Sequence, residues 1–126
     1  MSSGSLLGLR TAIYAVPDLA QAKAWYAGAL EREPYFDEDF YVGFNVGGFE
    51  LGLVPDAEVP VERDAAGVAF WGVLDAEVAY TRLVSLGASD HEPVQDVGGG
   101  VKIGAVRDPF GNVLGVVENP HFRYEA

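Results

Sequence analysis

Val16-Pro17-Asp18-Leu19 decides the fold, because the chain carries an equivalent stretch a second time at Val73-Leu74-Asp75-Ala76. In each copy a strand-like run ends and an Asp stands at the N-cap position of an amphipathic helix. The first helix is predicted to end near Leu30 and the second at Gly87. A strand, a helix and three strands are therefore predicted twice, at a spacing of roughly 57 to 65 residues, as expected of an internal repeat.

The fold class predicted from this repeat is α+β, with two tandem βαβββ modules that form a curved mixed sheet, or cup. Strands are predicted at residues 9–16, 40–46 and 49–54 in the first module and at 67–73, 101–107 and 113–117 in the second. The buried helix stripes are predicted at Leu19, Ala22, Trp25, Tyr26 and Leu30, and at Val78, Ala79, Leu83 and Leu86. The predicted organisation is a disordered start at 1–6, modules at 7–54 and 67–119, a linker at 55–66 and a tail at 120–126, all within one structural domain.

Composition excludes several classes of partner. The 126 residues hold 19 Asp plus Glu against 8 Lys plus Arg, for a formal net charge of −11. Nucleic acids and anionic membranes are poor partners for such a chain, because both need positive charge to neutralise phosphate. With no Cys and no long apolar run, we expect a cytoplasmic protein without disulfide bonds.

The predicted hairpin at Gly47-Gly48 separates two faces of the first module. One face is wholly apolar and belongs against the helix, whereas the other carries Tyr41, Asn45 and Glu50 between glycines. Glu50 beside Asn45 is the best site candidate in this half, although an exposed Glu on an outer strand accounts equally well for the alternation. The corresponding face of the second module holds Val113, Gly115 and Val117, so it is nearly bare of polar groups.

The doubled pattern resembles the vicinal oxygen chelate superfamily, which includes glyoxalase I, the bleomycin-resistance proteins and the extradiol dioxygenases. The residues that carry the resemblance are the first-helix opening at 16–19, Trp25-Tyr26, and the turn Asp108-Pro109-Phe110-Gly111-Asn112 before the last strand. The resemblance covers residues 7–119. Its motifs are specific to the superfamily and not to one function within it.

Enzymes of this superfamily hold a divalent metal at four strand positions, which the resemblance places at Thr11, Glu50, Val68 and Gly115. Only Glu50 among them carries a strong metal-binding side chain. The two histidines, His91 and His121, have no second ligand at a usable spacing, and a catalytic site usually needs three protein donors. We therefore expect neither a metal nor another cofactor.

The resemblance leaves three hypotheses open. The first is a metal-independent protein that binds a small molecule, as the bleomycin-resistance proteins sequester a cationic drug; here the ligand is a cationic or aromatic antibiotic. The second is an enzyme, a lyase, isomerase or dioxygenase with an atypical metal site or with Glu50 as general base. The third is a dimeric module without a ligand, and a homodimer is expected in any case. The predicted ligand-binding residues are Glu50, Asn45, Tyr41, Thr11, Phe70 and Tyr14.

Overall fold

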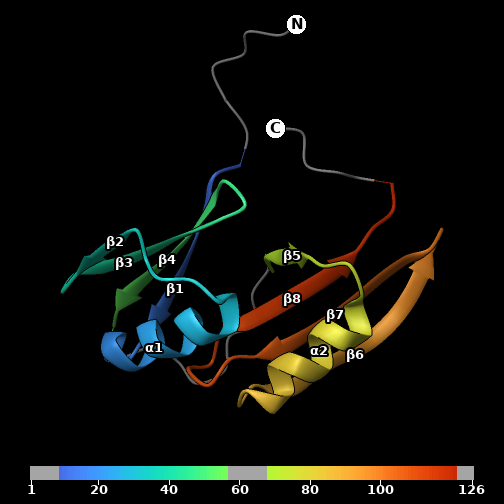
Figure 1. Cartoon of the computed structure of the whole chain (residues 1–126). Coiled ribbons are helices and arrows are strands. Elements are labelled where there is room, and N and C mark those ends of the chain that lie inside the picture. Colours follow the sequence, from blue (N-terminus) through green and yellow to red (C-terminus); the bar gives the residue numbers. More distant parts are fainter. Residues whose placement is uncertain (1–8, 57–67, 122–126) are drawn as a thin grey trace, which may run out of the picture. The chain divides into compact units, whose positions relative to one another are not determined.

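The structure is a computed structural model that describes residues 9–56 and 68–121, and these residues fall into two compact units. Figure 1 shows the first unit in blue to green and the second in yellow to red. Each unit has one helix and one four-stranded sheet. Each sheet is mixed. The strands that come first and last along the chain in each unit pair in parallel, and the other neighbouring strands pair antiparallel. The predicted α+β class and the repeat of the βαβββ pattern are confirmed.

In the first unit the sheet order is β1-β4-β3-β2. The elements are β1 (Thr11–Val16), α1 (Leu19–Leu30), β2 (Phe36–Glu38), β3 (Tyr41–Val46) and β4 (Phe49–Pro55). Asp18 caps α1 as predicted, since its Oδ1 accepts a hydrogen bond from Gln21 N at 3.0 Å. The face of the sheet that packs on α1 is apolar, and Tyr26, Phe44, Leu51 and Leu53 are fully buried.

In the second unit the order is β5-β8-β7-β6, which repeats the topology of the first. The elements are β5 (Phe70–Gly72), α2 (Ala76–Ser85), β6 (Ser89–Gly98), β7 (Val101–Arg107) and β8 (Val113–Glu118). Asp75 caps α2 by accepting from Glu77 N and Val78 N. Gly87 follows the helix at φ 114°, a conformation that suits glycine at a helix C-terminus.

The predicted hairpin in the first unit is correct in its register. Gly47 and Gly48 have φ values of 63° and 91°, and Asn45 faces Glu50 across the strands. Because side chains alternate along a strand, every second residue lies on the face of the sheet opposite α1, which we call the open face. On this face Phe36, Gly43, Gly52 and Ile13 form one row across the four strands.

Part of the predicted organisation lies outside the described residues. This holds for the start at 1–6, most of the linker at 55–66 and the end of the tail, whereas Pro55 belongs to β4. No helix in the described part of the chain is long and apolar enough to cross a membrane.

Candidate functional site

The most polar feature of the open face is the carboxylate of Glu50, which is bound by hydroxyl groups. Thr11 Oγ1 donates to Glu50 Oε1 at 2.8 Å, and Tyr35 Oη donates to Glu50 Oε2 at 2.5 Å. The phenol of Tyr41 lies near the same carboxylate, and each group shifts the pKa of the other. We call these four residues the hydroxyl–carboxylate cluster.

The pairing of the strands brings this cluster together. Thr11 on β1 lies directly across from Glu50 on β4, and Glu50 N donates to the carbonyl of Arg10 at 2.8 Å. Tyr35 precedes β2 and is held there because its N–H donates to Gly43 O at 2.9 Å. Three separate segments thus deliver hydroxyl groups to one carboxylate.

Two paired glycines make room for the cluster. Gly43 and Gly52 face each other on β3 and β4. A Cβ atom at Gly43 would lie 2.7 Å from Glu50 Oε2 and 3.0 Å from Tyr35 Cε1, and one at Gly52 would overlap the phenol of Tyr41. Any larger side chain here would push the phenol rings off the sheet, so the glycine pair is part of the site.

The hydrogen bonds change the acidity of the groups involved. Donation from Tyr35 is the main reason why the pKa of Glu50 is lowered, with Thr11 and Tyr41 acting in the same direction against the effect of burial. Burial, aided by the Glu50 carboxylate, raises the pKa of Tyr41 to about 12. The pKa of Tyr35 is raised as well, chiefly by its hydrogen bond to Glu50. At neutral pH the cluster is therefore one carboxylate surrounded by neutral hydroxyls.

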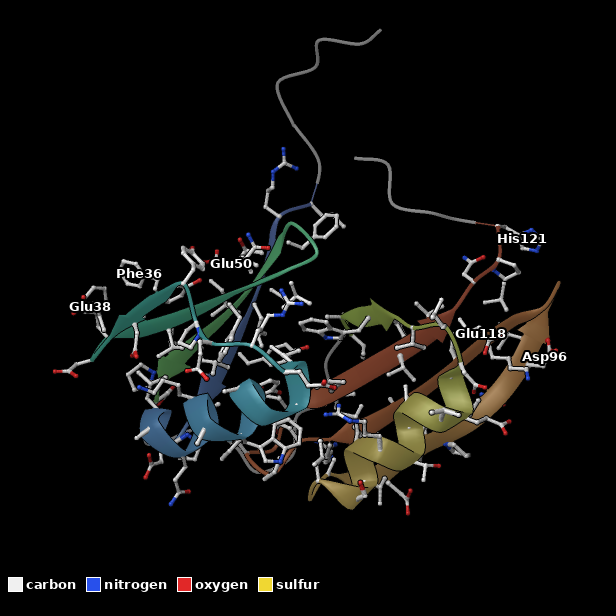
Figure 2. All side chains as sticks on the ribbon, viewed as in Figure 1. Phe36, Glu38, Glu50, Asp96, Glu118 and His121 are labelled. Carbon is white, nitrogen blue, oxygen red and sulfur yellow. The ribbon has the colours of Figure 1, made fainter. Side chains whose placement is uncertain are left out.

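Aromatic rings adjoin the cluster on the side of β2. The centroid of the Phe36 ring lies 5.9 Å from that of Tyr41 and 6.0 Å from that of Phe40, with interplanar angles of 64° and 71°. Phe40 and Tyr35 are 67% and 63% exposed, so these rings are not core residues. Figure 2 shows Phe36, Glu38 and Glu50 on the side of the first sheet opposite α1.

A hollow of about 210 Å³ lies beside the cluster at the end of the β3–β4 hairpin. It is lined by Arg10, Thr11, Tyr35, Asn45, Gly48, Phe49 and Glu50. A larger hollow of about 430 Å³ lies along the exposed side of α2, lined by Glu77, Val78, Thr81, Arg82 and Ser85. All of its residues come from one helix, so no groups converge there from different elements, and we place the site at the smaller hollow.

Of the residues predicted to bind a ligand, Thr11, Tyr41 and Glu50 lie together in the cluster. Asn45 lines the same hollow, although its Oδ1 accepts from Gly48 N at 3.0 Å and thereby fixes the turn. Tyr14 is not brought together with them: it is 7% exposed and its ring centroid lies 6.1 Å from that of Tyr26, on the α1 side of the sheet. Alternation with Thr11 already excludes it from the open face.

Tyr35 and Phe36 are the functional candidates that the sequence analysis missed. Phe36 pairs with Gly43, and a large residue beside a strand glycine is the signal that could have found it. The short strand β2 holds only three residues, which is too few to show a period of two.

The second unit has different side chains on its parallel strand pair β5–β8, which corresponds to β1–β4 of the first unit. Phe70 lies across from Gly115, and its ring covers that glycine so closely that a Cβ there would lie 2.6 Å from Phe70 Cδ1. Glu118 lies on the α2 side of its sheet, where its Oε1 accepts from Ala76 N at the start of the helix (Figure 2). The open face of this sheet is therefore apolar at the metal position that the resemblance assigns to Gly115.

The donors of the described residues do not fit the divalent metal of the superfamily. Val68 and Gly115 have no donor atoms in their side chains, so Glu50 is left without the further protein ligands that such a metal needs. Within residues 9–56 and 68–121, no three His, Asp or Glu side chains are grouped so that they could hold a metal ion. His121 instead places its Nε2 2.6 Å from the carbonyl of Gly99.

Comparison with known proteins agrees with the fold and with the repeat. A glyoxalase-related enzyme from Fulvimarina pelagi superimposes with a TM-score of 0.77 at 19% identity, over 96% of this chain and 94% of that one. A bleomycin resistance determinant encoded on the transposon Tn5 gives 0.71 at 17% identity, over 90% and 98%. A lactoylglutathione lyase from Agrobacterium tumefaciens gives 0.71 at 22% identity, over 95% and 99%. At these identities the similarity shows the fold alone.

No curated protein matches the sequence. The family profile described as Glyoxalase/Bleomycin resistance protein/Dioxygenase superfamily matches residues 8–116, which is most of the chain. The resemblance seen in the motifs is confirmed, and the chain belongs to the glyoxalase/bleomycin resistance protein/dioxygenase superfamily.

Proposed function

We propose that this protein binds a small organic cation without a metal ion, with the carboxylate of Glu50 as the counter-ion. The observation that carries the proposal is the state of Glu50: in the described part of the chain its carboxylate accepts hydrogen bonds from the hydroxyls of Thr11 and Tyr35 and forms no ion pair. Its negative charge is stabilised by these groups without being neutralised. A carboxylate of this kind is free to attract a positive ligand.

The surroundings of Glu50 support an aromatic or apolar body for the ligand. Tyr35 and Phe36 expose ring surface next to the carboxylate, and Ile13, 59% exposed, flanks the glycine pair on the other side. Cations bind favourably over the faces of such rings. The fold similarity to the bleomycin resistance determinant of Tn5 makes a cationic antibiotic one candidate for sequestration.

Catalysis with Glu50 as general base is the weaker alternative. A general base is most effective when its pKa lies near the working pH, whereas the hydrogen bond from Tyr35 lowers the pKa of Glu50. The two phenols are no better as acids, since the pKa values of Tyr35 and Tyr41 are both raised. These shifts favour binding over proton transfer. The homodimer and the cytoplasmic location stay predictions.

The proposal is tested with two probes of the same ring system that differ in charge and in one N-methyl group. N-methylquinolinium is a permanent cation, and quinoline is its neutral counterpart at pH 7.5. We expect the cation to bind about tenfold more tightly, as one charge-assisted contact implies. Glu50→Gln should abolish this preference, whereas Glu92→Gln, an exposed residue on β6 with the same change of charge, should preserve it. Calorimetric titration that gives equal affinities for the two probes would reject the proposal.

A further inference from the structure

The hairpin between β2 and β3 carries an unusual density of aromatic and acidic groups. Its residues 36–41 read Phe-Asp-Glu-Asp-Phe-Tyr. The two edge contacts of the Phe36 ring, with Phe40 and with Tyr41, make an aromatic corner at this hairpin. The corner is open to solvent, since Phe36 is 38% and Phe40 67% exposed. Burial in the core therefore does not explain why the rings gather here.

Two of the three acids of this hairpin, the strand residues Asp37 and Glu38, lie on opposite faces of the sheet. Asp37 pairs with Val42 and turns to the α1 side, where it forms an ion pair with Lys23 Nζ at 2.9 Å. Glu38 pairs with Tyr41 on the open face, next to the aromatic corner (Figure 2). In the described part of the chain, the carboxylate of Glu38 has no hydrogen-bond or ion-pair partner. One acid is neutralised, and the one beside the rings is not.

We propose that the aromatic corner of Phe36, Phe40 and Tyr41, with the carboxylate of Glu38, binds a methylated ammonium group. A quaternary ammonium gains from contact with ring faces and from an adjacent negative charge, but cannot donate hydrogen bonds. Rings and an unpaired carboxylate offer just those two interactions. A primary amine would instead be drawn to the hydrogen-bond acceptors of the Glu50 carboxylate.

This inference rests on the proposed function, in which the open face of the first unit binds a cation. It adds the chemical class of that cation. Tyr41 belongs to both places, since its ring contacts Phe36 and its phenol lies near the Glu50 carboxylate, which helps to raise its pKa. A ligand that carries a methylated ammonium and a second polar group would therefore contact the corner and the cluster at once.

The test uses tetramethylammonium and the neutral molecule of similar shape, tert-butanol, each titrated into the full chain and followed by backbone amide NMR shifts. Saturable shifts are expected at residues 36–41 with tetramethylammonium only. Phe40→Leu and Glu38→Gln should each weaken binding about two- to fivefold, as expected for an exposed cation–aromatic contact or a single surface charge. Leu74→Ala, which removes a fully exposed apolar side chain in the second unit, should leave the affinity unchanged.

Equal shifts with tert-butanol, or unchanged affinity in Phe40→Leu, would overturn the inference. The inference would also be overturned if tetramethylammonium caused no shifts at residues 36–41 while N-methylquinolinium still bound through Glu50. In that case the proposed function would stand. The opposite result is that N-methylquinolinium shows no preference that depends on Glu50, while tetramethylammonium still shifts residues 36–41. This result would count against the hydroxyl–carboxylate cluster as a cation site and would support the aromatic corner.

Discussion

The two units repeat one topology but fill the same position with opposite chemistry. Across the parallel pair β1 and β4, Thr11 faces Glu50, and a carboxylate lies on the open face. Across the equivalent pair β5 and β8, Phe70 faces Gly115, and an aromatic ring lies there instead. A glycine supports the arrangement in both units, since Gly52 lies beneath Tyr41 as Gly115 lies beneath Phe70. The repeat thus preserves the scaffold and the space above it, while the chemistry of that space differs.

The same contrast appears in the turns that precede the last strands. The first unit uses two glycines, and the side chain of the exposed Asn45 accepts a hydrogen bond from Gly48 N in this turn. The second uses a loop from Asp108 to Asn112, in which Asp108 is 3% exposed and Asn112 4%. Asp108 Oδ1 accepts from Phe110 N at 2.9 Å and from Asn112 N at 2.8 Å. The motif shared with the superfamily is therefore a turn held by its own buried side chain.

The largest expected effect comes from breaking this turn. Asp108→Ala leaves two backbone N–H groups without their acceptor, so we expect a loss of about 2–3 kcal/mol in the free energy of unfolding. Asn45→Ala in the first unit removes one exposed hydrogen bond and should cost less than about 1 kcal/mol. Urea unfolding of the two variants gives the comparison. Equal losses would mean that the buried turn is not the stronger of the two.

These turns also show how far the sequence predicts the fold. Proline, glycine and Asp-capped helix starts have local signatures, so the two helices, the β3–β4 register and the β7–β8 hairpin could be predicted correctly. Helix periodicity was less reliable. Val78, predicted to be buried, is 65% exposed, because Ala76, Tyr80 and Leu83 form the stripe that faces the sheet. Val78 lies about 200° around the helix from Ala76, on the opposite side.

The site could be predicted only in part, because its key contacts join segments that are far apart in the sequence. Glu50 and Thr11 could be found from strand alternation and from the resemblance. The hydroxyl of Tyr35 reaches Glu50 across Gly43, a contact that depends on the missing Cβ atom and on the approach of the chain before β2. No local pattern encodes such a contact.

An effect of intermediate size on stability is expected at Gly52 and Gly115, the glycines beneath Tyr41 and Phe70. Gly52→Ala places a methyl group against the phenol of Tyr41, which is held by Glu50 and by Phe36, so we expect a loss of about 1–2 kcal/mol from overpacking. Gly115→Ala meets the ring of Phe70, which is 47% exposed and can turn toward solvent, so its cost should be below about 1 kcal/mol. Thermal unfolding distinguishes the two. A larger loss in Gly115→Ala would show that Phe70 is the more rigidly held ring.

The smallest effect on stability, and the most specific to the first unit, is expected from Glu50→Gln. The wild-type carboxylate has a lowered pKa, so it stabilises the folded protein above the ordinary value of 4.5, and this contribution is lost as the pH falls through the lowered pKa. The glutamine variant lacks that contribution, and its stability should depend less on pH in the acid range.

At the alkaline end the tyrosines report the same change. In the wild type the neutral forms of Tyr35 and Tyr41 are favoured by folding, so their contribution is complete below pH 10.0 and, for Tyr41, is lost as the pH rises through about 12. Glu50→Gln should lower both pKa values, but that of Tyr41 should stay above 10.0 because burial is the larger cause of its shift. Tyr80 in the second unit has a pKa raised by burial and by Asp90, and it should not respond. Residue-specific NMR titration of the tyrosine rings measures all three, and a parallel shift of Tyr80 would show that Glu50 acts through the overall charge of the protein instead of through direct hydrogen bonds.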